Sequence, residues 1–213
     1  MRNLHVPLVL AVLLCPGLAS ALPDENRPNV LERLEARFEK NPELRKLTQG
    51  PPEPMQRVKW MTGKWDVSLT QAATGRTPQK VDKGTRETSF ELGGRWLISR
   101  NTMSVEKSEE FIAYDPFGRN WYWQFFSSAG RGTNTALLGT SGWDEGTLKL
   151  EGTFSVYEES ANITLFIKKL SANEYVEVFT EILPDGTRLP ILEYNYTRQA
   201  AASNGPARKP TKK

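Results

Sequence analysis

The stretch "WMTGKWDVS", residues 60–68, marks the point where the character of the sequence changes. Trp60 and Trp65 flank Gly63, and a run typical of a β-strand begins at Trp65. Before this stretch the apolar residues recur at helical spacing, whereas after it short β-rich runs alternate with turn residues. The pattern therefore predicts that a β-domain begins here, with an indole at the start of its first strand.

About ten short runs follow Trp65, and residues typical of turns separate them. We expect strands near residues 65–71, 79–91, 95–104, 109–115, 120–128, 133–140, 147–156, 162–170, 174–182 and 188–198. The separator "DPFG" at 115–118 suits a type I turn, and the "DG" at 185–186 suits a tight hairpin. No helical pattern lies between the runs. The sequence thus predicts a mainly β fold, an antiparallel up-and-down β-barrel of about ten strands that occupies residues 55–199.

Residues 22–54 form a helical lead and linker in this interpretation. Asn29 precedes a run with apolar residues at helical spacing and suits the N-cap position. A second short helical turn, "PELRKL", follows, and the breaker-rich "TQGPPEP" ends it. Residues 55–63 read as another short helix that ends at Gly63.

The first 21 residues are typical of an export signal peptide. Arg2 precedes the apolar run "LHVPLVLAVLLC", and Ala19, Ser20 and Ala21 form a small-residue cleavage pattern. An uncleaved membrane anchor is the alternative, although the run is barely long enough to span a bilayer. After cleavage before Leu22 we expect no transmembrane segment and a periplasmic or secreted protein.

Cleavage would remove the chain's single Cys and single His, Cys15 and His5. The mature chain could then form no disulfide and no Cys-based or Ser-His nucleophilic site. Structural zinc needs thiolates or imidazoles, and the usual haem site needs a proximal His. We therefore expect no metal site and no cofactor, and any catalysis would depend on carboxylate, Lys, Tyr, Ser or Arg side chains.

The charge of the chain is concentrated at its ends. Omitting Arg2 and the four basic residues after Arg198 leaves 23 basic and 25 acidic side chains, a net charge of −2 for the folded part. This balance gives no basic face for nucleic acid. Residues 200–213 lack apolar periodicity, and we expect a disordered basic tail that can be deleted without loss of fold and that touches anionic envelope surfaces weakly.

The motif at residues 63–65 resembles the Gly-x-Trp signature that opens the first strand of lipocalin-like (calycin) barrels. In those barrels the Trp closes one end, and an Arg from the last strand covers it. Here "YNYTRQ" offers Arg198 at the matching place. The resemblance thus implies a structural plug made by Gly63, Trp65 and Arg198.

A closer resemblance covers most of residues 50–198. The segments "GPPEPMQRVKWMTGKWDV", "ELGGRWLISR", "IAYDPFGRNWYWQFF" and "LEYNYTR" are similar to an uncharacterised bacterial secreted family of unknown function with a lipocalin-like barrel. Members often have Gly-Pro-Glu-His before the first strand, whereas Pro54 stands at the His position here. The resemblance implies a bacterial source and brings no chemistry with it.

Alternation along the strands suggests which side chains meet inside the barrel. Trp96, Ile98 and Arg100 share one face of their strand, and similar rows contain Trp123 and Tyr194. If these rows point inward, they predict a pocket bounded by Trp96, Arg100, Tyr114, Trp123 and Tyr194. A lone Arg100 among aromatic side chains would need an anionic partner, either a carboxylate such as Glu193 or the acid group of a ligand. A shift of one residue would put a row outside.

Three functions are compatible with this pattern. The first is an exported barrel that binds one small, mostly apolar or amphipathic ligand and catalyses no reaction. The second is an enzyme that uses carboxylate and Tyr groups as acid and base, which two inward carboxylates with raised pKa at a pocket mouth would favour. The third is an envelope structural or interaction protein with a solid core, which an interior filled by Trp and Phe would favour.

Overall fold

The computed structural model describes residues 28–75, 77–129, 136–139, 143–144, 146–156 and 159–200. The predicted signal peptide lies outside these residues, and so does the predicted basic tail except for its first residue, Ala200. The chain divides into two compact units, Met1–Glu43 and Leu44–Lys213. The boundary predicted between the helical lead and the barrel domain, at residues 54 and 55, stays a prediction.

The N-terminal helices confirm the expected helical lead. Helix α1 spans Val30–Lys40 and begins at a capping box, in which Asn29 Oδ1 accepts hydrogen bonds from the backbone N–H groups of Leu31 and Glu32. Glu32 Oε2 in turn accepts a hydrogen bond of 2.7 Å from the backbone N–H of Asn29. A short helix α2 follows at Pro42–Lys46, with Pro at its first position. Of the helices in the described part, none is both long and apolar enough to cross a membrane.

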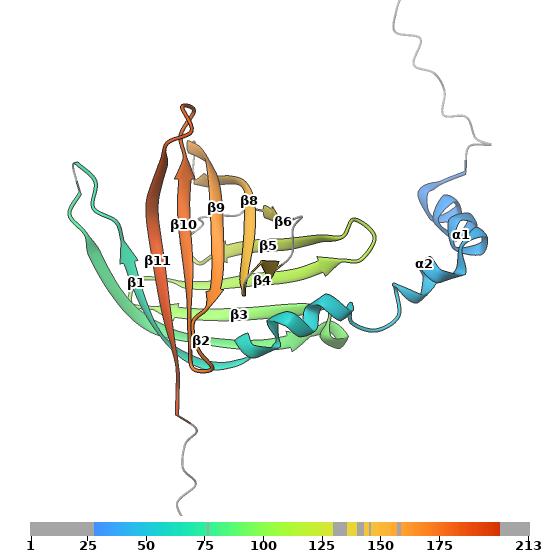
Figure 1. The fold of residues 1–213 in the computed structure, drawn as a ribbon, viewed down its shortest axis with the longest axis horizontal. Helices are drawn as coiled ribbons and strands as arrows, with labels where there is room; N and C mark the ends of the chain where they lie inside the picture. The colour runs from blue at the N-terminus through green and yellow to red at the C-terminus, as the bar shows by residue number, and fades with distance from the viewer. Residues whose placement is uncertain are drawn as a thin grey trace, which may run out of the picture. The chain divides into compact units, whose positions relative to one another are not determined.

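Within the second unit, a 3-10 helix, η1, spans Glu53–Met61 and precedes the sheet. Met55, Val58 and Met61 are fully buried and belong to the core of the barrel. Figure 1 shows η1 leading directly into β1. Trp60, near the end of η1, and Trp65, in β1, therefore both lie where the sheet begins.

In the described part of the chain, eleven strands form one antiparallel sheet. They are β1 (Gly63–Gln71), β2 (Lys80–Glu91), β3 (Trp96–Met103), β4 (Lys107–Asp115), β5 (Asn120–Ser127), β6 (Ala136–Gly139), β7 (Trp143–Asp144), β8 (Thr147–Val156), β9 (Glu159–Lys169), β10 (Glu174–Ile182) and β11 (Arg188–Arg198). Between β2 and β3 lies η2 (Leu92–Gly94), a tight turn in which Gly93 and Gly94 adopt positive φ angles. At the β4–β5 turn, Asp115 accepts hydrogen bonds from the backbone N–H groups of Phe117 and Gly118, as suits the predicted type I turn.

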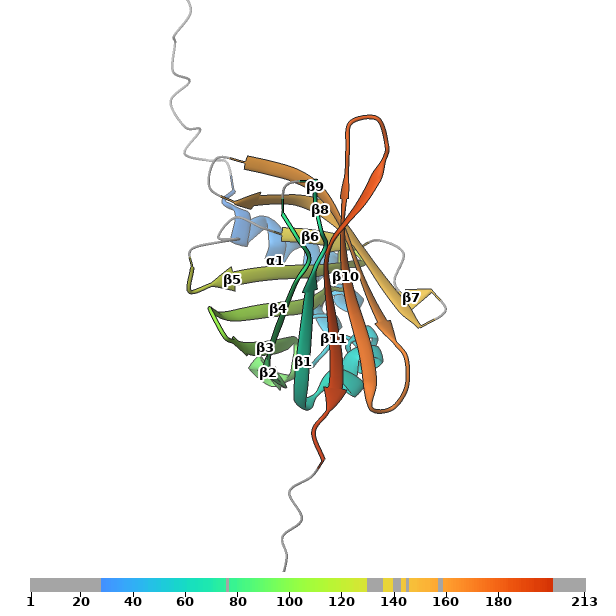
Figure 2. The same cartoon turned by 90° about the vertical axis from the view of Figure 1, so that its left-hand side faces the viewer.

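The sheet closes on itself. Neighbouring strands pair in sequence from β1 to β6 and from β8 to β11, β1 pairs with β11, and β6 pairs with β8. Ten strands therefore complete the ring. The short β7 pairs with β8 and is not part of the ring. Figures 1 and 2 show β9–β11 crossing the direction of β3–β5, so that the two parts of the sheet face each other across the interior. The predicted ten-strand antiparallel barrel is confirmed.

Alternate side chains of each strand fill the interior. On β5, Trp121, Trp123 and Phe125 are buried, whereas Tyr122 and Phe126 are exposed. This alternation is what a barrel with one packed face requires. The two ends of the interior differ, because one is filled with aromatic rings and the other contains a cavity.

Candidate functional site

The closed end of the barrel is built around Gly63. This residue has φ +118°, and the position that a Cβ would take lies 2.7 Å from Arg198 Nη1, so only glycine leaves room for the guanidinium. Arg198 Cζ lies 4.0 Å from the ring centre of Trp65. The same guanidinium donates hydrogen bonds to the carbonyl oxygens of Thr62 at 2.9 Å and Trp60 at 2.7 Å. The guanidinium of Arg198 therefore lies over Trp65 in the space beside the backbone of Gly63.

Above Trp65, aromatic rings continue into the interior. Trp65 meets Tyr175 edge-on at 4.8 Å, and Tyr175 stacks on Tyr196 at 4.1 Å. The Arg86 guanidinium lies 4.4 Å from the ring centre of Tyr196. Aromatic side chains thus pack this part of the barrel. The hypothesis of a structural or interaction protein with a solid core required such packing throughout the interior.

Arg86 on β2 is the centre of a buried polar cluster. Its side chain is fully buried, and it donates hydrogen bonds to Glu177 Oε1 at 2.6 Å, to Tyr175 Oη at 2.9 Å and to Asn101 Oδ1 at 2.7 Å. Its Nη2 forms an ion pair with Glu110 Oε1 that lacks hydrogen-bond geometry. The two carboxylates raise the pKa of Arg86 well above its ordinary value, although burial acts to lower it. Arg86 is therefore a permanent cation inside the barrel.

The two carboxylates around Arg86 have different surroundings. Glu110 accepts hydrogen bonds from Asn101 Nδ2 at 3.0 Å and from Trp123 Nε1 at 3.2 Å, whereas Glu177 accepts one from the Tyr196 hydroxyl at 2.8 Å. Burial raises the pKa of Glu177 to about 7, while the ion pair with Arg86 acts to lower it and the charge of Glu110 to raise it. One buried cation thus faces two carboxyl groups, and the second of them holds a proton more readily than a free Glu does.

A cavity of about 560 Å³ occupies the other part of the interior. Its described walls are mostly apolar and come from nearly every strand: Leu69, Val81, Met103, Phe125, Phe154, Ile163, Phe179, Ile191 and Leu192. Glu110, Trp123 and Tyr194 bring polar atoms to it from the side of the Arg86 cluster. Burial raises the pKa of Tyr194, so its hydroxyl stays neutral.

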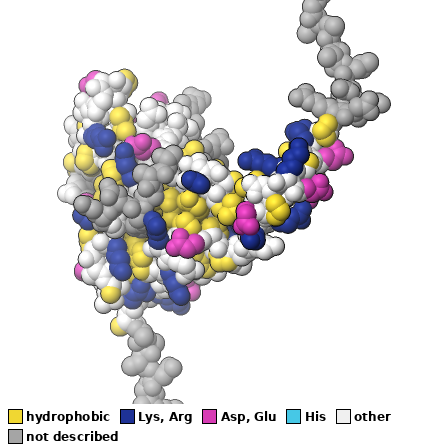
Figure 3. Space-filling model, turned by 45° about the vertical axis from the view of Figure 1, so that its right-hand side comes forward, with side chains coloured by type: hydrophobic (Ala, Val, Ile, Leu, Met, Phe, Trp, Pro, Cys, Tyr) yellow, Lys and Arg dark blue, Asp and Glu magenta, His cyan; other side chains and the backbone are white. Residues whose placement is uncertain are grey.

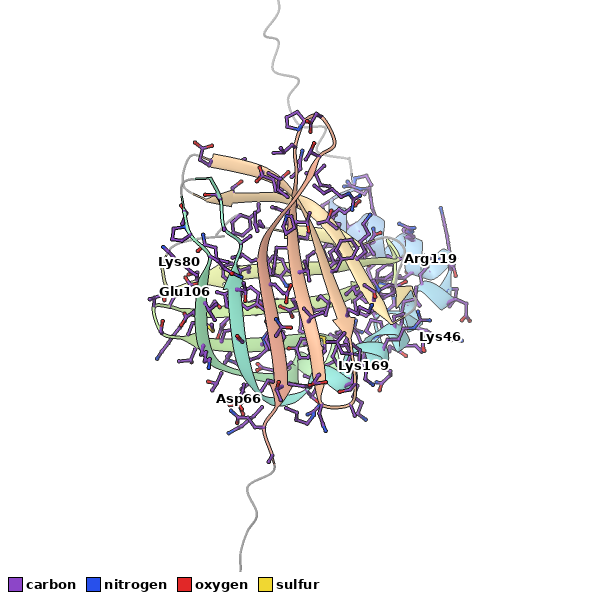
Figure 4. The ribbon with its side chains drawn as sticks, turned by 60° about the vertical axis from the view of Figure 1, so that its left-hand side comes forward. Lys46, Asp66, Lys80, Glu106, Arg119 and Lys169 are labelled. Atoms are coloured by element: carbon purple, nitrogen blue, oxygen red, sulfur yellow. The ribbon has the colours of Figure 1, made fainter. Side chains whose placement is uncertain are left out.

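The cavity reaches the surface at the end of the barrel remote from Gly63. Lys80, which pairs with Gln71 at the β1–β2 turn, lines it together with Asp82 and Glu106. Figure 4 shows Lys80 and Glu106 at the same side of the barrel, while Asp66 lies toward the opposite end. The cavity therefore has an apolar body and a mouth with charged residues.

Two of the five predicted pocket residues, Trp123 and Tyr194, line this cavity. Tyr114 also belongs to the inward row of β4, but it packs edge-on against Trp121 at 5.3 Å and is not among the residues that line the cavity. The predicted rows of β5 (Trp121, Trp123, Phe125) and β11 (Leu192, Tyr194, Tyr196) do face the interior.

Trp96 and Arg100 lie on the outer face of β3, contrary to the prediction. Arg100 is half exposed and forms ion pairs with Glu91 at 2.6 Å and Glu109 at 3.0 Å. Trp96 packs against Phe111, also on the outer face. The inward row of β3 contains Ser99 and Asn101 between apolar residues, and this polarity makes the row look outward-facing in the sequence. Ser99 is hydrogen-bonded to Thr88, and Asn101 to Arg86 and Glu110.

The anionic partners of Arg100 are thus protein carboxylates, as one of the two alternatives predicted, but they are Glu91 and Glu109 and not Glu193. Glu193 is exposed and accepts a hydrogen bond from Asn195 Nδ2 at 2.7 Å. The buried cation that does need anionic partners is Arg86, and Glu110 and Glu177 supply them.

Sequence reasoning missed the whole Arg86 cluster, although a signal for it exists. Glu177 lies between Tyr175 and Phe179 in a row of alternate residues, and Arg86 lies between Gly84 and Thr88. A charged residue within an otherwise inward-facing row of each of two strands suggests an interior ion pair. The pairing itself required the closed barrel, because residues 86 and 177 are distant in sequence.

No group of three or more Asp, Glu, His or Cys side chains among the described residues could hold a metal ion.

The described surface shows no separate basic region on the face drawn in Figure 3. The described basic side chains there are interspersed with hydrophobic and acidic ones.

Comparisons with known proteins agree with this architecture. Among solved structures, the crystal structure of Rv2717c from M. tuberculosis matches with a TM-score of 0.52 at 9% sequence identity, over 70% of this chain and 99% of that chain. A likeness at this identity shows the fold alone. The comparison with curated proteins found no match. A model of the family described as "Protein of unknown function (DUF1579)" matches residues 51–198, and the chain therefore belongs to that family.

Proposed function

We propose that this chain binds one small, mostly apolar or amphipathic ligand inside its barrel and that it acts outside the cytoplasm, in the periplasm or as a secreted protein. The observation that carries the binding proposal is the cavity of about 560 Å³ with apolar walls and a few polar atoms at one side. Small-molecule sites in proteins are typically of about 300–1,000 Å³ and have this composition. The proposed location rests on the sequence of the first 21 residues alone.

The division of the interior supports binding rather than a purely structural role. Trp65, Tyr175 and Tyr196 pack against one another at one end, so aromatic side chains occupy that part of the interior. At the other end Leu69, Ile191 and Leu192 line open space instead. An unfilled apolar cavity lowers the stability of a fold, because its lining loses van der Waals contacts.

An enzyme with two interior carboxylates is less well supported. Glu110 and Glu177 are both inward, as that hypothesis required, but of the two only Glu110 lines the cavity. Glu177 is fully buried behind Arg86, where a substrate in the cavity does not reach it.

Binding can be tested with the neutral fluorescent probe N-phenyl-1-naphthylamine. The probe should show enhanced emission with the wild-type protein, and the emission of Trp123 should fall because Trp123 lines the cavity. Ile163→Phe should weaken binding by filling part of the cavity, since Ile163 is buried in its wall. Leu170→Phe is the matched control, because Leu170 is exposed and does not line the cavity. Equal affinity of the wild type and both variants would contradict binding in the interior, as would no binding of the probe at all.

A further inference from the structure

The charge balance of the interior indicates what kind of head group the cavity accepts. The described buried side chains include one cation, Arg86, and two carboxyl groups, Glu110 and Glu177. Both groups are in direct ion-pair contact with Arg86, so the cation has no unmatched positive charge left for a ligand. A ligand carboxylate would add a third acid to this cluster, and like charges at short range in an apolar interior repel strongly.

Glu110 is the member of the cluster that faces the cavity. It is almost fully buried and lines the cavity beside Trp123 and Tyr194. Its Oε1 contacts Arg86 and Asn101, whereas Oε2 accepts one bond, of 3.2 Å, from Trp123. A carboxylate oxygen accepts two hydrogen bonds, so Oε2 has capacity for one more donor.

The charged side chains at the mouth of the cavity are mostly negative, as Glu110 is in its interior. Among the described residues, the charged side chains that line the mouth are Asp82, Glu106 and the cation Lys80. A hydrogen bond from Ser104 lowers the pKa of Asp82, so this group is ionised near neutral pH. Acidic groups at an opening raise the local concentration of cations and lower that of anions.

We propose that the cavity selects small amphipathic amines, with the protonated amino group donating to Glu110 and the apolar part lying along the walls. An ammonium group would bring the cluster of Arg86, Glu110 and Glu177 to two positive and two negative charges when both carboxylates are ionised. A buried charge is tolerated where it is paired and hydrogen-bonded in this way. This inference rests on the proposed function, because it names the ligand class of the same cavity.

The test compares the dissociation constants of three ligands of equal chain length, octylamine, octanol and octanoate. They are measured by isothermal titration calorimetry at neutral pH with the full chain. The wild-type protein should bind octylamine most tightly and octanoate most weakly, by about tenfold or more between the two. Glu110→Gln should remove the preference for octylamine over octanol. The control is Glu109→Gln, on the same strand but half exposed and paired with Arg100, which should behave like the wild type.

The outcomes separate the two proposals. Octanoate binding as tightly as octylamine would overturn the amine assignment and leave ligand binding standing, and so would an unchanged octylamine preference in folded Glu110→Gln. If that variant does not fold, as judged by circular dichroism, the order of the three ligands on the wild-type protein decides by itself. If no ligand of the three binds and N-phenyl-1-naphthylamine does not bind either, the proposed function fails and the amine assignment fails with it.

Discussion

Trp65 is held from three sides at the closed end of the barrel. Its indole N–H donates a 2.8 Å hydrogen bond to the carbonyl oxygen of Met61, Arg198 lies over one face, and Tyr175 packs edge-on against it. The side chain is fully buried. A cation over a desolvated indole contributes up to about 2 kcal/mol, and the burial of the ring contributes more. The Gly-x-Trp motif therefore acts as a packing device whose glycine makes room for the cation.

Replacing Trp65 with Ala should lower the free energy of unfolding by about 3–5 kcal/mol, because the change opens a cavity in the closed end and leaves Arg198 without its ring. Urea denaturation followed by circular dichroism measures the loss. Trp96→Ala is the control, since Trp96 lies on the outer face and is only partly buried, and it should cost clearly less. An unchanged midpoint for Trp65→Ala would show that the plug does not stabilise the barrel.

The carboxyl group of Glu177 should make stability depend on pH. Burial raises its pKa from 4.5 to about 7 in the folded protein, so the folded state binds this proton more tightly than the unfolded state does. The free energy of unfolding should therefore decrease as the pH rises from about 4.5 to about 7, and this group should contribute no further change above that range.

The variant Glu177→Gln should flatten this dependence, because Gln does not ionise. Urea denaturation of the wild type and the variant between pH 5 and pH 8 checks the prediction. The same slope in both proteins would contradict it.

At the scale of elements, the 3-10 helix η1 belongs to the barrel as much as the strands do. Met55, Val58 and Met61 of this helix are as fully buried as the residues of the strands that form the core. Its carbonyl oxygens at Trp60 and Met61 also accept hydrogen bonds from Arg198 and Trp65. The helix therefore stabilises the closed end through both apolar packing and hydrogen bonds.

Met55→Ala should accordingly lower the free energy of unfolding by about 2–5 kcal/mol, as expected for a fully buried Met. Gln56→Ala, at an exposed position of the same helix, should change it by less than about 0.5 kcal/mol. Thermal unfolding of both variants provides the comparison. A similar melting temperature for the two would mean that η1 merely precedes the barrel.

Local patterns predicted the strands well, because turn residues mark their ends and β-rich runs lie between them. Every expected strand overlaps a strand of the structure, and residues 133–135 and 140 of the run expected at 133–140 lie outside the described residues. The short β7 at Trp143–Asp144 was not expected, since two residues give no periodicity. Face assignment failed on β3, where the outward row contains Trp96 and the inward row contains Ser99 and Asn101. Hydrophobicity alone indicates the wrong face wherever a buried polar cluster lies inside.

At the scale of the whole molecule, the interior has three zones in order. Aromatic rings around Trp65 and Tyr175 fill the closed end, the Arg86 cluster follows, and the cavity lies beyond Glu110. Closure depends on the β6–β8 pairing, which joins the two halves of the sheet through only three residue pairs. The arrangement gives a rigid base to a hollow end, which is the geometry that a small-ligand site needs.

The most direct test of an interior binding site is a methyl NMR titration of the isoleucine-labelled protein with N-phenyl-1-naphthylamine. Ile163 and Ile191 line the cavity, so their δ1-methyl signals should shift as the probe binds at one molecule per chain. Ile98, which lies on the outer face opposite Phe111, should not shift. If the probe binds while the methyl signals of Ile163 and Ile191 stay unchanged, or if only the signal of Ile98 shifts, the claim that this barrel holds its ligand inside is contradicted.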